Sequence, residues 1–114
     1  MINLHIIAKT NLLGKITDDI NSYLLNDKRV NIVSIKKHPY WKDNRLEERY
    51  IQFKAEKLDI DEWIVFFSIV SSHHTILSPD EDSLEICNFC SLEDLLIHDM
   101  IFAVLQVSIK EIKS

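Results

Sequence analysis

Residues 29–56 read RVNIVSIKKHPYWKDNRLEERYIQFKAE, and this stretch decides the fold. Its first part, residues 29–37, is rich in β-branched side chains, which favour a strand. In its last part, Ile51, Phe53 and Ala55 alternate with polar side chains, as in a strand with one buried face. His38-Pro39 ends the first strand, because proline cannot donate a hydrogen bond to a sheet. The stretch therefore predicts a β-hairpin whose loop covers residues 40–45.

The segments on both sides of this hairpin predict helices. Residues 2–8 are short and apolar and predict a buried strand. From Thr10 onward, apolar side chains recur every three or four residues, which predicts a helix ending near Asn26-Asp27. After the hairpin, Asp59 or Asp61 can cap a second helix that continues to residue 70. Residues 64–67 also fit a buried strand, so that alternative stays open.

The last third of the chain predicts short strands followed by a helix. Residues 75–77 and 84–89 are short extended stretches on either side of a polar turn at 78–82. Ser91 and Asp94 have the spacing of a helix start. Apolar side chains continue at helical spacing to Val107, which predicts one helix over this range, although residues 101–109 also alternate like a strand.

This order of elements predicts one α+β domain over residues 1–114. We expect an antiparallel-rich sheet with helices on one face. The leading specific hypothesis is a ferredoxin-like β-α-β-β-α-β unit followed by a C-terminal helix.

The composition excludes several classes of protein. Apolar residues make up 46% of the chain, and the longest apolar run is far shorter than the roughly 20 residues needed to cross a bilayer. Gly14 is the only glycine, so neither a P-loop nor a dinucleotide-binding fingerprint can form. Two cysteines make no disulfide framework, and the N-terminus lacks the features of a signal peptide. We expect a cytoplasmic protein without a cofactor.

Charge is distributed unevenly along the chain. The net charge is −5 overall, with −1 in residues 1–27, +5 in residues 28–57 and −9 in residues 58–114. Such asymmetry predicts an acidic face and a smaller basic one, although solvated outer faces of each segment would give the same numbers.

Cys87 and Cys90 form a Cys-x-x-Cys motif, but neither redox chemistry nor zinc binding suits it. A redox pair needs its attacking cysteine at a helix N-terminus, and Cys87 lies about one turn too early. A zinc site would need His73 and His74, or His98, and adjacent histidines lack the usual gap between ligands. We expect both cysteines to be small buried side chains and predict no metal site.

The histidines also allow a general acid–base hypothesis. His73, His74 and His98 have side chains that titrate near neutral pH, and His98 adjoins Asp99. No serine lies in a recognised nucleophile motif. We therefore expect a protein that is not an enzyme, with a His-dependent hydrolase as an alternative.

Two stretches are the candidates for binding. Residues 36–45 combine basic groups with two adjacent aromatics, which suits either a protein–protein hot spot or the stacking of nucleic-acid bases. Acidic residues between 80 and 99 suit pairing with lysines and arginines of a partner. The candidate partner-binding residues are Tyr40, Trp41, Arg45, Asp80, Glu81, Asp82, Glu85, Glu93 and Asp94.

In its size, acidity and lack of a catalytic motif, the chain resembles bacterial immunity proteins, including those of contact-dependent growth inhibition systems. The resemblance implies a tight complex with a toxin domain, often a basic nuclease, whose active site or other essential surface is blocked. The contact would lie in the acidic stretch Asp80–Asp99 or in the loop His38–Arg45. We expect a protein partner rather than a membrane or a small molecule, with a small nucleic-acid-binding module as an alternative.

Overall fold

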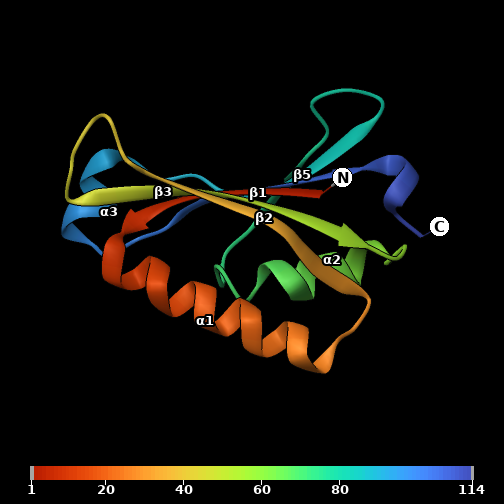
Figure 1. Cartoon of the computed structure of the whole chain (residues 1–114). Coiled ribbons are helices and arrows are strands. Elements are labelled where there is room, and N and C mark those ends of the chain that lie inside the picture. Colours follow the sequence, from red (N-terminus) through yellow and green to blue (C-terminus); the bar gives the residue numbers. More distant parts are fainter. Residues whose placement is uncertain (1, 114) are drawn as a thin grey trace.

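A computed structural model describes residues 2–113 of the chain (Figure 1). It is a mixed α+β structure, as predicted. The elements are β1 (Ile2–Lys9), α1 (Thr10–Asn26), β2 (Val30–Pro39), β3 (Leu46–Ala55), α2 (Ile60–Phe67), β4 (Thr75–Leu77), β5 (Ser83–Asn88), α3 (Leu92–Ile97), β6 (Phe102–Ser108) and a 3₁₀ turn, η1 (Ile109–Glu111). Within residues 2–113, no helix is both long and apolar enough to cross a membrane.

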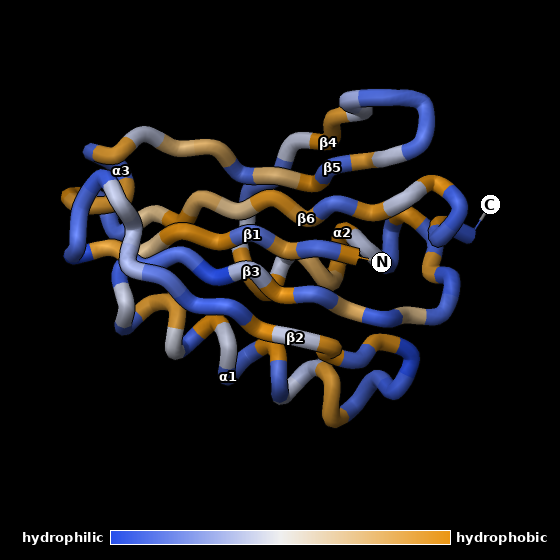
Figure 2. The backbone as a smooth tube through the Cα atoms, turned by 45° about the horizontal axis from the view of Figure 1, so that its top comes forward, coloured by the Kyte–Doolittle hydropathy of each residue, from blue (hydrophilic) through white to orange (hydrophobic). Residues whose placement is uncertain are grey.

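The six strands form one antiparallel sheet in the order β2-β3-β1-β6-β5-β4 (Figure 2). The first four strands in this order, joined by α1 and α2, have a ferredoxin-like order, but the last of them is β6 rather than the strand predicted at 84–89, and no α-helix follows it within residues 2–113. In place of a direct connection from α2 to the last strand, the chain inserts β4, β5 and α3. The β4–β5 hairpin extends the sheet beyond β6 and leaves β4 and β2 as its two edges.

Helices α1 and α2 cover one face of the sheet and enclose the core (Figure 1). Alternate residues of β1, including Ile2, Leu4 and Ile6, are fully or almost fully buried there. Helix α2 contributes Trp63, which is fully buried. The opposite face of the sheet, turned away from α1 and α2, is named the open face here. The short helix α3 packs at one end of the open face, through Leu95 against Ile7 and Leu46.

The predicted helix from Ser91 to Val107 is wrong over its second half. Its start is confirmed, because the Ser91 and Asp94 side chains form a reciprocal capping box at α3. The helix ends at Ile97, and residues 102–108 form β6, which pairs with both β1 and β5. Apolar spacing in this segment fits either structure, and the pairing with β1 buries Ala103, Leu105 and Val107 together on the core face.

The predicted hairpin is confirmed with longer strands. Its loop covers residues 40–45 as expected, but β2 continues through His38-Pro39. Proline is tolerated there because β2 is an edge strand and need not donate on its outer side. Arg49 lies on the core side of β3, only 6% exposed, where it donates to the Leu13 carbonyl and the Thr17 hydroxyl.

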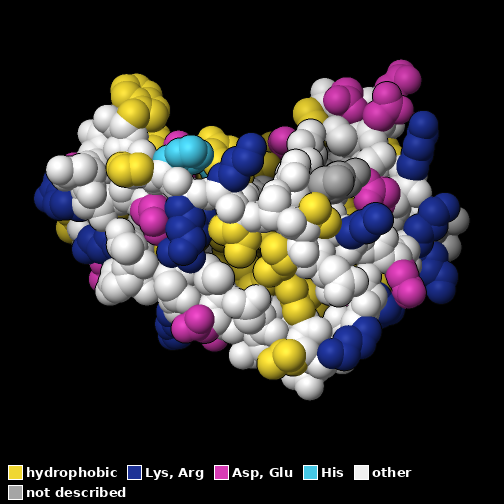
Figure 3. All heavy atoms as spheres, viewed as in Figure 1, with side chains coloured by type: hydrophobic (Ala, Val, Ile, Leu, Met, Phe, Trp, Pro, Cys, Tyr) yellow, Lys and Arg dark blue, Asp and Glu magenta, His cyan; other side chains and the backbone are white. Residues whose placement is uncertain are grey.

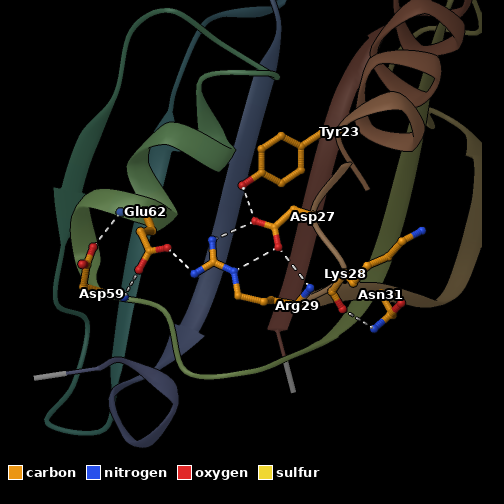
Figure 4. A network of polar contacts seen from close by, with 7 residues as sticks. All are labelled: Tyr23, Asp27, Lys28, Arg29, Asn31, Asp59 and Glu62. Carbon is orange, nitrogen blue, oxygen red and sulfur yellow. Dashed lines mark hydrogen bonds and ion pairs between the residues drawn. The ribbon is translucent and has the colours of Figure 1, made fainter. Parts of the chain in front are cut away.

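A network of charged side chains fastens the end of α1 to α2 (Figure 4). Arg29 donates to both carboxylate oxygens of Asp27, at 3.0 and 2.8 Å, and also to Glu62. The Tyr23 hydroxyl donates to Asp27 as well. Glu62 in turn belongs to the capping box of α2 with Asp59. The hydrogen bonds from Arg29 lower the pKa of Asp27 to about 2.

The pKa of Asp27 predicts how acid weakens the fold. A carboxyl whose pKa is lower in the folded chain stabilises it above the ordinary pKa, and this stabilisation is lost as the pH falls through the folded value. The substitution Asp27→Asn should therefore lower the free energy of unfolding by about 1 kcal/mol at pH 7, the size of a charge-assisted hydrogen bond partly screened by solvent. The difference should shrink from about pH 4 downward and vanish only below about pH 2. Urea unfolding at a series of pH values measures it, with the exposed Asp18→Asn as control; a difference independent of pH would contradict the assignment.

Candidate functional site

The open face of the sheet is hollowed between two raised walls (Figure 3). The hairpin loop 40–45 and α3 form the wall with exposed hydrophobic side chains, and the turn between β4 and β5 forms the wall with acidic side chains (Figures 1 and 3). Two cavities of about 650 and 600 Å³ lie between the walls. His5 and Tyr50 line both cavities, so these two side chains separate one from the other.

The first cavity has an amide-rich floor. Pairing of β1 with β3 and β6 brings Asn3, Gln52 and Gln106 side by side across three strands. Ser34 donates to the Gln52 side chain at 3.0 Å, and Glu85 from β5 extends the row. Amide side chains both donate and accept hydrogen bonds, so this row can bind polar groups of either kind.

The second cavity is lined by rings and is named the aromatic cavity here. Its rings belong to His5, Tyr40, Trp41, Tyr50 and Phe102. The His5 and Tyr50 rings are stacked, with centroids 4.2 Å apart and an angle of 8° between planes. His5 and Phe102 pack edge to face, with ring centroids 5.6 Å apart.

Glu48 is the only carboxylate lining the aromatic cavity within the described part of the chain. Its side chain is 15% exposed. His5 Nε2 donates to its Oε2 at 3.0 Å, and the Tyr50 hydroxyl donates to the same oxygen at 3.3 Å. Burial and the negative charge of Glu48 raise the pKa of Tyr50. Both bonds go to Oε2, so Oε1 has no donor among residues 2–113.

Backbone and side-chain bonds hold the loop 40–45 in a fixed shape. Tyr40 donates from its N–H to the Leu46 carbonyl, and Arg45 donates to both carboxylate oxygens of Asp43, at 2.9 and 2.7 Å. These bonds lower the pKa of Asp43 to about 2. The loop thereby presents Trp41, which is 79% exposed, with the Lys42 ammonium 5.2 Å from its ring centroid.

The predicted partner-binding residues are divided between the two walls. Tyr40 and Trp41 line the aromatic cavity, whereas Arg45 is engaged by Asp43. The predicted acids do not form one patch, because Asp80, Glu81 and Asp82 lie in the β4–β5 turn, Glu85 lies on the floor, and Glu93 and Asp94 belong to α3 at the other end of β5.

Two of the predicted acids have structural roles. Asp80 accepts hydrogen bonds from the Asp82 N–H and the Ser83 hydroxyl, which fold the turn. Asp94 caps α3. Glu81 and Asp82 form no ion pair within residues 2–113 and remain available to a partner.

The three histidines of the acid–base hypothesis, His73, His74 and His98, have no ring hydrogen bond to another side chain within residues 2–113. Asp99, expected beside His98, instead forms an ion pair with Lys9 at 2.6 Å. His73 and His74 are exposed in the connection before β4, and the Ser71 hydroxyl bonds to the backbone of His73 rather than to its ring. No group of three metal-binding side chains occurs in the described chain.

The His5–Glu48–Tyr50 group was not identified from the sequence as a site. His5 was assigned only to a sheet, and Glu48 lies 43 residues away from it. The available signal was the polar alternation of Glu48, Tyr50 and Gln52 along β3, which marks a second sheet face that is not part of the core.

No protein-family model, curated protein or solved structure matches this chain.

The cysteines should be poor nucleophiles at neutral pH. Burial, aided by Asp94, raises the pKa of Cys90 to about 11, and burial with Glu85 raises the pKa of Cys87. In a Cys87→Ala variant, labelling of Cys90 by a thiol reagent at pH 7 should be roughly a hundredfold slower than that of a free cysteine. The rate should rise about tenfold for each pH unit up to pH 10, because the thiolate is the reacting form. Rapid labelling at pH 7 would indicate an activated thiol and revive the redox hypothesis.

Proposed function

We propose that this chain is an immunity-type inhibitor that binds a basic toxin domain, of the nuclease class, on the open face of its sheet. The observation that carries the proposal is the exposed hydrophobic wall beside a hollowed sheet face. Trp41 is joined there by Phe89, which is 55% exposed, and by Leu92. Exposed aromatic side chains beside a concave surface are the usual anchors of protein–protein interfaces.

The charge of the second wall supports a basic partner. Glu81 and Asp82 at the tip of the β4–β5 turn, and Glu85 on the floor, have no ion pair with any residue in 2–113. Several other acids are neutralised by arginine within the chain, including Asp27, Asp43 and Glu47. An acidic wall attracts a basic partner and speeds its association.

Two steps test this function: capture of a protein partner by the tagged chain, and co-expression of that partner with this chain in cells. The tagged chain should recover a basic protein domain in a one-to-one complex, and that domain should be toxic to cells unless this chain is co-expressed. Recovery of the chain without a protein partner, or of a domain whose toxicity it does not suppress, would contradict the proposal.

Matched charge reversals then locate the acidic contact. The double variant Glu81→Lys, Asp82→Lys should slow association with the captured domain at least tenfold at low ionic strength, because steering acts mainly on the association rate. The double variant Asp18→Lys, Asp19→Lys makes the same change of charge on the exposed side of α1 and should have a much smaller effect. Asp80 is left intact because it folds the turn. Equal slowing by both pairs would show an effect of net charge alone.

A nucleic-acid-binding module is the second candidate, favoured by one observation. The stacked His5 and Tyr50 rings lie on β1 and β3, the two inner strands of the four-strand part β2-β3-β1-β6, with Lys36 and His38 beside them on β2. Sheet faces with central aromatics of this kind stack single-stranded bases. This candidate requires salt-dependent binding of oligonucleotides that is lost in Tyr50→Ala.

A further inference from the structure

We infer that the aromatic cavity is a subsite for one arginine side chain of the partner, held by ring stacking and by the carboxylate of Glu48. This inference rests on the proposed function for the source of that side chain. Its chemistry, however, follows from the cavity itself and can be tested on the chain alone.

The carboxylate of Glu48 can accept a further hydrogen bond from a ligand. Glu48 reaches the cavity with one oxygen, Oε2, occupied by His5 and Tyr50 and the other, Oε1, without a donor in residues 2–113. A half-buried carboxylate is stabilised by each added hydrogen bond from a charged donor. The two existing bonds also fix the position of the carboxylate before a ligand arrives, which lowers the entropic cost of binding.

The surface around the carboxylate is aromatic, which suits a planar cation. Five rings line a cavity of about 600 Å³, a space that easily admits a single side chain. The faces of aromatic rings attract cations, and a guanidinium group also stacks flat against them. Arginine therefore matches both features, because its planar head can stack on the rings while one N–H points to Oε1.

The wall beside the cavity already holds a cation, the ammonium group of Lys42. The Lys42 ammonium lies against Trp41, so this wall accommodates positive charge within the chain itself. Lys42 is the only lysine or arginine, and Glu48 the only carboxylate, among the described residues that line the cavity. A ligand cation would compete with Lys42, whereas a ligand anion would need it.

Nuclear magnetic resonance titration of the free chain with a blocked arginine, N-acetyl-arginine amide, tests the inference. Binding should be weak, with a Kd on the order of 1 mM, as suits one side chain. Resonances of His5, Tyr50 and Trp41 should shift together, and the neutral analogue N-acetyl-citrulline amide should bind at least about tenfold more weakly. Equal binding of the two probes, or a stronger response to inorganic phosphate, would overturn the assignment.

Four variants separate the roles of individual side chains. Glu48→Gln should weaken arginine binding about tenfold, while Glu56→Gln, at an exposed position just beyond the same strand, should leave it unchanged. Trp41→Ala should weaken it too, and the high exposure of Trp41 keeps this variant informative if Glu48→Gln fails to fold. Lys42→Gln should leave binding unchanged or strengthen it; a loss would indicate an anion site.

Two measurements separate failure of this inference from failure of the proposed function. One is the affinity of the free chain for the blocked arginine, and the other is the affinity of the captured complex. If the blocked arginine binds and Glu48→Gln also weakens the captured complex at least tenfold, the side chain comes from the partner. A micromolar Kd for the blocked arginine would instead indicate a small-molecule site and overturn the assignment to a protein side chain. If no toxin partner is recovered, the titration still decides whether the cavity binds guanidinium.

Discussion

The central strand β1 is buried on one face and open on the other, and this constraint organises the whole molecule. Ile2, Leu4 and Ile6 fasten the sheet to α1 and α2, so the intervening residues Asn3 and His5 must face away from the core. Within residues 2–113 there is only one more α-helix, the six-residue α3, and it covers one end of the open face. The uncovered remainder carries polar and aromatic side chains, which tolerate water and can bind a partner.

Local hydrogen bonds and ion pairs shape the loop and the turn in the two walls of the open face. Arg45 and Asp43 fix the loop that presents Trp41, and Asp80 folds the turn that presents Glu81. Because these bonds are short-range, each wall is formed before a partner arrives. Preformed surfaces lose less conformational entropy on binding, which suits an inhibitor that must bind tightly. The floor between the walls carries the carboxylate of Glu48 and the amides of Asn3, Gln52 and Gln106.

Much of the fold could be predicted from the sequence because its signals are local. The stripe of α1, the capping box at Ser91 and the hairpin around residues 40–45 each depend on residues a few positions apart. Strand β6 could not be assigned in the same way, since residues 102–108 fit a helix or a strand and pairing with β1 decides between them. Tyr40 and Trp41 were predicted to bind a partner because two adjacent aromatics stand among basic residues, and both line the aromatic cavity. The pairing of His5 with Glu48 depends on the register of β1 against β3, which no local pattern specifies.

Mapping the surface that contacts the partner tests most directly whether the open face is the binding surface. The isotope-labelled chain would be titrated with its captured protein partner, and the backbone amide shifts would be followed by nuclear magnetic resonance. If the partner binds on the open face, the largest shifts should fall on three regions. These are the alternate residues of β1 and β3 that face the open side, the loop 40–45 and the β4–β5 turn. Shifts concentrated on the outer surfaces of α1 and α2, with the open face unchanged, would contradict it.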